Sequence, residues 1–260
     1  MVDMPGTVEI IGLTGLPLVK PGNDIAELVF NRARSLGVRF ADGDIVVIGH
    51  KILSKSEGRI IELSKVKPST RAVNIARRSS KDPRLVQLII NEARRIIKVR
   101  RGIILTEARQ GIVCLNAGID KSNVQGDDTY CLLPVNPNLT AQRIAKRISH
   151  LAGKRVRVVV TDTHSRPFRV GQSEFAIGTS RLDPFFDYRG RKDLFGHILK
   201  FKRVSIADEL ACAAELVMGQ GAEGIPVAII RGVRRIRDAG KRRASRLEMK
   251  RDRDLFRSSL

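Results

Sequence analysis

Apolar runs alternate with amphipathic segments along most of this chain. Apolar runs, typical of strands buried on both faces, occupy residues 45–49 and 225–230, and the β-branched run at 155–160 is interpreted in the same way. Shorter strands are expected at residues 7–13, 102–105, 111–115, 130–133 and 171–178. Apolar residues at helical spacing predict helices at residues 25–35, 70–78, 82–97, 140–150 and 206–217. The pattern therefore predicts a mixed α/β protein.

One strand leads into a cluster of side chains that suit cation and phosphate chemistry. The run from Arg155 is expected to end in Thr161-Asp162-Thr163-His164, and Arg166 and Arg169 follow. A carboxylate there can hold a hard cation, and guanidinium groups can grip phosphate or carboxylate oxygens. A simpler reading, with Asp162 capping a turn and the arginines solvated, is equally compatible with this stretch.

Three further polar segments follow predicted strands or helices, where α/β proteins often bind ligands. Residues 50–59 come directly after a buried strand, and residues 116–124 contain Asp120 and Asn123 as potential oxygen ligands. Glycines at 219, 221 and 224 would let backbone N–H groups approach a phosphate, although in isolation a helix end followed by a flexible connector is the better explanation of them. Residues 181–196 form a long predicted loop, a length that hints at function. The chain has no GxxxxGK[ST] motif and no GxGxxG suitably placed after a strand.

Composition narrows the class of protein. With 260 residues, of which 42 % are hydrophobic, the chain can build a substantial core. No apolar run is long enough to span a bilayer, and the N-terminus does not resemble a secretion signal. The three cysteines are far apart and form no CxxC pair, which argues against a disulfide framework or a structural zinc site. We therefore expect a cytoplasmic protein.

The formal charge of +21 has three competing explanations: nucleic-acid binding, attraction of anionic substrates, and a charged surface suited to a hot or salty cell. Aromatic residues make up only 4 %, which argues against a single-strand reader built on stacking. The segment from Arg231 onward is strongly basic, and residues 242–256 are predicted to form a terminal helix.

Several motifs in combination resemble one enzyme family. The chain contains GLPL at 15–18, NAGIDKSN at 116–123, TDTHSRPFR at 161–169, GRKDLFG at 190–196 and MGQGAEGIP at 218–226. Together they resemble the coenzyme F420-0:γ-glutamyl ligases, the CofE family. The resemblance spans nearly the whole chain, so we expect one ligase domain at 1–232 and a basic tail at 233–260.

The resemblance implies a fold, a reaction and cofactors. It implies a family-specific α/β fold with mixed sheets flanked by helices, assembled as an intertwined homodimer. Members use GTP to activate the terminal carboxylate of F420-0, through an acyl phosphate, for attack by L-glutamate, and further γ-linked glutamates then follow. They require Mn²⁺ or Mg²⁺, with two sites expected, and K⁺ assists.

The resemblance also assigns residues. Asp120, Asp162, Thr163 and Gln220 match divalent-metal positions. The matched GTP contacts are Leu16, Pro17, Leu18, Val19, His50, Lys51, Lys55, Asn123, Met218, Gly219, Gln220, Gly221, Ala222, Glu223, Gly224 and Ile225. His50 occupies a position where some relatives have Ser or Gln, so a backbone contact is expected there.

The residue chemistry fits this reading independently. Phosphoryl transfer relies on oxygen-bound cations and on positive charge near the developing anion. We expect Asp120, Asp162, Arg166 and Arg169 to be catalytic. Two alternatives stay open at this point: a γ-glutamyl ligase acting on another carboxylated cofactor, and a nucleic-acid-binding protein. Nucleic acid is otherwise expected to bind only weakly, through the tail.

Overall fold

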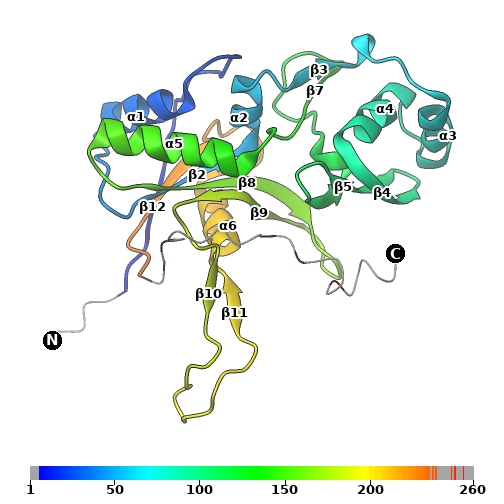
Figure 1. Ribbon diagram of the computed structural model, residues 1–260. Coiled ribbons are helices and arrows are strands. Elements are labelled where there is room, and N and C mark those ends of the chain that lie inside the picture. Colours follow the sequence, from blue (N-terminus) through cyan, green and yellow to red (C-terminus); the bar gives the residue numbers. More distant parts are fainter. Residues whose placement is uncertain are drawn as a thin grey trace.

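A five-stranded mixed sheet forms the centre of the molecule (Figure 1). The computed structural model describes residues 6–234 together with residues 236, 238, 247, 249 and 254. In spatial order the strands are β1 (Glu9–Gly12), β12 (Val227–Arg231), β2 (Ile45–Gly49), β8 (Arg157–Ser165) and β9 (Gln172–Ser180). Only β2 and β8 run parallel, while the other neighbouring pairs are antiparallel. The predicted mixed α/β class is therefore confirmed.

Helices cover both faces of this sheet, which explains why its central strands are continuously apolar. Side chains of β2 alternate between the two faces: Val46 and Ile48 pack in one core with α1 and α5, and Ile45 and Val47 pack in the other with α6. Figure 1 shows α1 and α5 on one side and α6 on the other. The bounds of these helices are α1 (Ile25–Ser35), α5 (Pro137–Ala152) and α6 (Ile206–Met218).

A smaller lobe lies beside the central sheet (Figure 1). It contains α3 (Thr70–Ser79), α4 (Pro83–Glu92) and a three-stranded antiparallel sheet of β4 (Ala93–Arg100), β5 (Ile103–Ala108) and β6 (Val113–Leu115). The short helices η1 (Leu63–Lys65) and η2 (Asn116–Gly118) contact α4 of the lobe, whereas α2 (His50–Ser56) lies over the central sheet. The remaining two strands are β3 (Ile60–Glu62) and β7 (Thr129–Cys131). Strands β3 and β7 pair in a two-stranded ribbon that links the lobe to the body.

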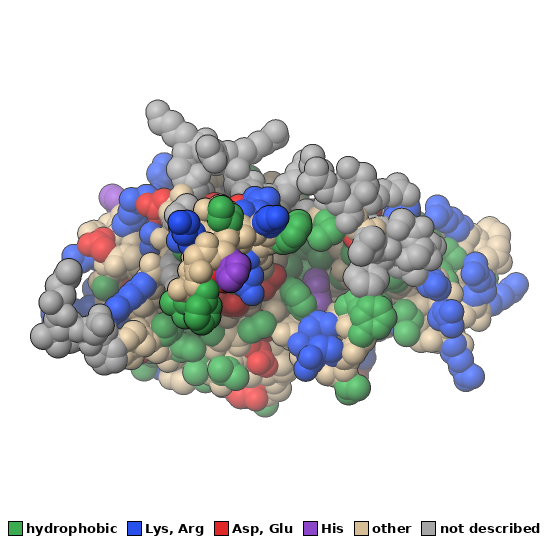
Figure 2. Space-filling model, turned by 90° about the horizontal axis from the view of Figure 1, so that it is seen from below, with side chains coloured by type: hydrophobic (Ala, Val, Ile, Leu, Met, Phe, Trp, Pro, Cys, Tyr) green, Lys and Arg blue, Asp and Glu red, His purple; other side chains and the backbone are tan. Residues whose placement is uncertain are grey.

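A long hairpin projects from the body on the α6 side (Figure 1). Its base is the antiparallel pair β10 (Phe185–Asp187) and β11 (Arg203–Ser205). Leu194, Phe195 and Phe201, beyond this base, are almost fully exposed. Figure 2, which looks toward the hairpin from below, shows hydrophobic and basic side chains standing together on this face. Among the described residues, no helix is long and apolar enough to cross a membrane.

The structure corrects several predicted elements. The helix expected at 82–97 ends at Glu92, because Ala93–Arg100 pairs with β5 instead, and this tertiary pairing overrides the apolar spacing. The segment after β2 forms α2, and the expected loop at 181–196 belongs to the β10–β11 hairpin. The strand expected to end around Asp162 continues to Ser165, because β9 pairs with it throughout. The terminal helix predicted at 242–256 falls almost wholly outside the described residues.

Candidate active site

A cavity of about 440 Å³ opens where several strands of the central sheet end. Strand β2 leads directly into α2, β1 leads into the loop around Leu16, and β12 begins after the glycine loop at 219–224. Since β12 runs antiparallel to both β1 and β2, its start lies beside their ends. The topology therefore brings segments far apart in the chain to one edge of the sheet.

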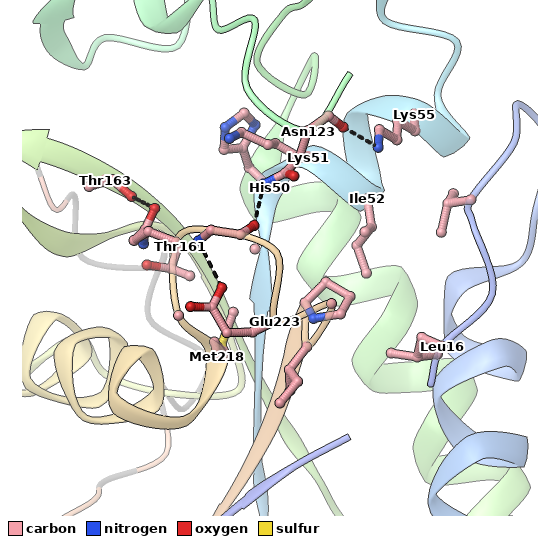
Figure 3. Close-up of a pocket in the computed structure, with 18 of the residues that line it drawn as sticks. Leu16, His50, Lys51, Ile52, Lys55, Asn123, Thr161, Thr163, Met218 and Glu223 are labelled. Carbon is pink, nitrogen blue, oxygen red and sulfur yellow. Dashed lines mark hydrogen bonds between the residues drawn. The ribbon is translucent and has the colours of Figure 1, made fainter. Parts of the chain in front are cut away.

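All sixteen residues expected to contact a nucleotide line this cavity, and Figure 3 labels Leu16, His50, Lys51, Lys55, Asn123, Met218 and Glu223 among them. Asp162 and Thr163, expected as metal ligands, line it as well. Asp120 does not contribute to the lining, but it binds Lys51, which does. Arg166 and Arg169 also lie outside the cavity wall. The cavity is therefore lined by all the predicted site residues except Asp120, Arg166 and Arg169.

Asp162 lies between two histidines. His50 Nε2 is 3.2 Å from Asp162 Oδ1, and His164 Nε2 is 3.0 Å from Oδ2. The His50 side chain is almost fully buried, and its Nε2 lies within ion-pair distance but outside hydrogen-bond geometry. Burial alone would raise the pKa of Asp162, but the charge of His50 and a hydrogen bond from His164 outweigh it and hold this pKa well below its usual range. The side chain of His50 therefore contacts Asp162, whereas only a backbone contact was expected at this position.

Asp120 is held by the residue next to His50. Lys51 Nζ lies 2.7 Å from Asp120 Oδ2, and the backbone and hydroxyl of Ser122 donate hydrogen bonds to the same carboxylate. Burial would raise the pKa of Asp120, but the hydrogen bonds from Lys51 and Ser122 keep it below its ordinary value. Consecutive residues of α2 therefore contact the two aspartates that sequence analysis selected.

Lys55, Asn123 and Gly221 form a bridge across the cavity mouth. Lys55 Nζ donates to the backbone oxygen of Asn123 at 2.7 Å (Figure 3), and Asn123 Nδ2 donates to the backbone oxygen of Gly221 at 3.1 Å. This bridge connects α2, the 116–124 segment and the glycine loop. A lysine ammonium and an amide are thereby held where an anionic ligand would meet them.

The glycine loop is shaped by Glu223. Its carboxylate accepts a hydrogen bond of 2.7 Å from the backbone N–H of Gly221. Gly219 has φ of +66°, and a Cβ atom there would lie 2.4 Å from Glu223 Cδ. The backbone conformation at 219 therefore favours glycine, and a Cβ there would also displace the Glu223 carboxylate from the N–H of Gly221.

Sequence analysis missed Glu174, a buried carboxylate in the cavity wall. Glu174 lies opposite Thr163 in the β8–β9 pair and accepts hydrogen bonds from Thr161, Thr163 and Gln220. The available signal was an acidic residue directly before the apolar residues 175–177, in a strand that follows the Thr161-Asp162-Thr163 strand after a short turn.

Arg166 and Arg169 lie in the turn between β8 and β9. Arg169 is exposed, whereas Arg166 is partly buried and its Nε atom has no hydrogen-bond partner within the described residues. The structure thus separates both arginines from the cavity wall while keeping them on the same ribbon as Asp162.

Comparison with known proteins identifies the family. The F420-0:gamma-glutamyl ligase family matches residues 14–232. The chain belongs to the F420-0:γ-glutamyl ligase family. A coenzyme F420:L-glutamate ligase of Methanothermobacter thermautotrophicus is 46 % identical over 225 residues, covering 86 % of this chain and 89 % of that protein. A ligase of the same name from Methanocaldococcus jannaschii is 44 % identical over 234 residues, covering 89 % and 90 % respectively. The protein is therefore an enzyme, and its class is ligase.

The donor atoms of this ligase fit a hard divalent cation. Among the described residues, no three His, Cys, Asp or Glu side chains are grouped so that they alone would hold a metal ion. The expected set instead mixes carboxylates with neutral oxygens, and Thr163 Oγ1 lies 2.9 Å from Gln220 Oε1. Oxygen donors of this kind suit Mg²⁺ and Mn²⁺, which usually complete their coordination with water and phosphate oxygens.

Proposed function

We propose that this enzyme uses GTP to join L-glutamate to the terminal carboxylate of coenzyme F420-0, and then adds further γ-linked glutamates. Two findings support the proposal: membership of the ligase family, and one cavity lined by all sixteen expected nucleotide contacts. The second finding carries most weight, because the sixteen residues come from four separate segments of the chain and yet line one cavity.

In the proposed reaction, the γ-phosphoryl group of GTP passes to a carboxylate oxygen of F420-0, which gives an acyl phosphate and GDP. The amine nitrogen of glutamate then attacks the carbonyl carbon. The new C–N bond replaces the C–O bond to phosphate, inorganic phosphate leaves, and the amine loses a proton.

The residues of the cavity have roles that this chemistry requires. Lys51 and Lys55 bring positive charge to the cavity wall, where it would stabilise the triphosphate and the charge that develops during transfer. The glycine loop would approach the phosphates closely with its backbone. Arg166 and Arg169 are proposed to bind the anionic groups of F420-0 or glutamate from the β8–β9 turn.

We assign Asp120 and Asp162 to a first divalent cation, Mn²⁺ or Mg²⁺, and Thr163 and Gln220 to a second, with K⁺ assisting. A bound divalent cation would neutralise phosphate charge and orient the transferred group. The protein's own contribution is to hold these oxygens in place, which His50, His164 and Lys51 do for the two aspartates.

The homodimer is also part of the proposal. The β10–β11 hairpin carries exposed Leu194, Phe195 and Phe201, and large exposed apolar groups of this kind mark contact surfaces. A second copy of the chain would cover them in an intertwined dimer. We further propose a cytoplasmic location, because all three cysteines are free thiols.

Mass spectrometry of F420-0 incubated with glutamate, GTP and Mn²⁺ tests the function. We expect products heavier by one and then more glutamyl residues, together with GDP, and no product when GTP or the metal is omitted. Unchanged F420-0 in the complete mixture would refute the proposal. Glutamylation of another carboxylated cofactor under the same conditions would identify the substrate alternative.

A further inference from the structure

Glu174 is a buried carboxylate without a cationic partner in the described part of the chain. It is only 5 % exposed, and no Lys, Arg or His nitrogen of that part lies within ion-pair distance. Asp44, the other carboxylate buried to this degree, forms a two-pronged ion pair with Arg231 at 2.9 Å. Because a buried charge is costly unless it is paired or bound to a metal, Glu174 requires an explanation.

Too few protons are available for the oxygens around Glu174. Thr163 Oγ1 lies within hydrogen-bond distance of both Glu174 Oε1 and Gln220 Oε1. A hydroxyl has one proton, so it cannot donate to both acceptors at once. Gln220 Nε2 already donates to Glu174 at 2.7 Å, which fixes the direction of the amide and leaves its oxygen facing Thr163. One of the two oxygen–oxygen contacts of Thr163 therefore lacks a proton.

A divalent cation accounts for this arrangement. We propose that Glu174 is a further ligand of the second cation site, alongside Thr163 and Gln220. This inference rests on the proposed function, which assigns those two residues to that site. A hydroxyl and an amide carry no net charge, whereas Mg²⁺ and Mn²⁺ sites in proteins normally include one or two carboxylates. Glu174 supplies the missing negative charge, and its position in the cavity wall gives a ligand phosphate access to the same cation.

Strand pairing gives the proposed ligand a fixed position. Glu174 and Thr163 are register partners in the antiparallel pair of β8 and β9, so their side chains emerge on the same face. Thr161 Oγ1 donates to the other oxygen of Glu174 and orients the carboxylate. Two of the three proposed ligands thus come from a rigid ribbon, and only Gln220 comes from a loop.

Direct titration with Mn²⁺, followed by electron paramagnetic resonance of the free ion, tests the proposal in the full chain with and without GDP. Glu174→Gln keeps the shape of the side chain and one acceptor oxygen, but it replaces the other oxygen with an amide donor and removes the charge. We expect this variant to lose affinity for one of two bound ions by about tenfold or more, and Glu174→Asp to recover part of the loss. Glu209→Gln, an exposed change on α6, is the matched control and should bind as the wild type does. Thermal unfolding in chelator verifies that each variant is folded.

The outcomes separate this inference from the proposed function. Binding of both ions by Glu174→Gln within threefold of wild type would overturn the ligand assignment, whatever the activity. A wild-type protein that glutamylates F420-0 but binds a single Mn²⁺ would overturn it as well. A selective loss of one ion in Glu174→Gln would support the assignment, even if F420-0 proved not to be the substrate.

Discussion

His50 and Asp162 face each other one residue beyond the last parallel pair of β2 and β8. Gly49 is the register partner of Thr161, so the next residue on each strand brings the imidazole and the carboxylate to 3.2 Å. The parallel pairing of β2 with β8 therefore also sets the distance between the side chains of His50 and Asp162 in the cavity.

Replacing Asp162 should be far more damaging than replacing His50. Asp162→Ala removes the carboxylate assigned to the first cation, so we expect ligase activity to fall by orders of magnitude. His50→Ala keeps the carboxylate but removes one of its two imidazole partners, and a loss of about 10- to 100-fold is expected. Steady-state rates of glutamyl transfer, measured at saturating Mn²⁺, give the comparison. Full activity in Asp162→Ala would contradict the metal assignment.

Asn123→Ala should weaken nucleotide binding. The change breaks the link from Lys55 through Asn123 to Gly221 by removing the donor to Gly221. Loss of one hydrogen bond of this kind costs about 0.5–1.5 kcal/mol, so KM for GTP should rise by about 2- to 13-fold. Kinetics at varied GTP and fixed glutamate measure this change. An unaltered KM for GTP would show that the bridge does not contribute to the bound state.

Gly219→Ala should impair GTP binding more than Gly224→Ala. Both glycines have positive φ, but Gly219 combines it with ψ of 176°, a region that only glycine adopts readily, and only a Cβ at 219 would push against Glu223. At Gly224 nothing lies within 4 Å of the added atom. Titration with GDP, followed calorimetrically, separates the two effects, and equal losses in the two variants would contradict the steric argument.

Asp82→Ala should destabilise the smaller lobe in a pH-dependent way. Asp82 caps α4 by accepting a 2.7 Å hydrogen bond from the backbone of Arg84, and hydrogen bonds from the Arg84 side chain lower the pKa of this carboxyl below 3.8. Loss of the cap should cost about 1 kcal/mol of unfolding free energy at neutral pH. Because the folded-state pKa is lowered, the stabilisation is present above pH 3.8 and disappears as the pH falls through the folded value. Urea unfolding of both proteins at pH 7 and at lower pH tests the prediction. A difference that grows as the pH falls would have the wrong sign.

Polar substitutions on the exposed part of the hairpin should dissociate the proposed dimer. Phe195→Ser and Phe201→Ser remove large exposed side chains that contribute little to the core of one chain. We expect sedimentation velocity to show a dimer for the wild type and a monomer for the double variant, with unchanged thermal unfolding of the secondary structure. A wild-type monomer at micromolar concentration would contradict the homodimer.

The sequence predicted the central sheet better than the smaller lobe, for a physical reason. Strands such as β2 are buried on both faces, so they read as unbroken apolar runs. Strand β4 is half-buried, and its Arg-Arg-Ile-Ile segment continues the helical spacing of α4 until pairing with β5 decides otherwise. Local periodicity carries no information about that partner.

The candidate site divides in the same way. The family motifs selected the segments that line the cavity, because the resemblance matched those positions residue by residue. They did not locate Glu174, whose neighbours Thr163 and Gln220 are fixed by strand register and loop path. His50 was found, but its contact with Asp162 depends on β2 and β8 lying in parallel, which no short motif encodes.

Strand β12 lies between β1 and β2, although it is made after every other strand of the described chain. During synthesis, β1 and β2 therefore lack β12, the strand that pairs with both of them, until residue 231 has left the ribosome. The glycine loop enters the fold in the same late step, so the nucleotide site that we propose would be complete only when the sheet is. Acquisition of GTP affinity would thus report the end of folding, and a prematurely terminated chain would expose strand edges that favour aggregation.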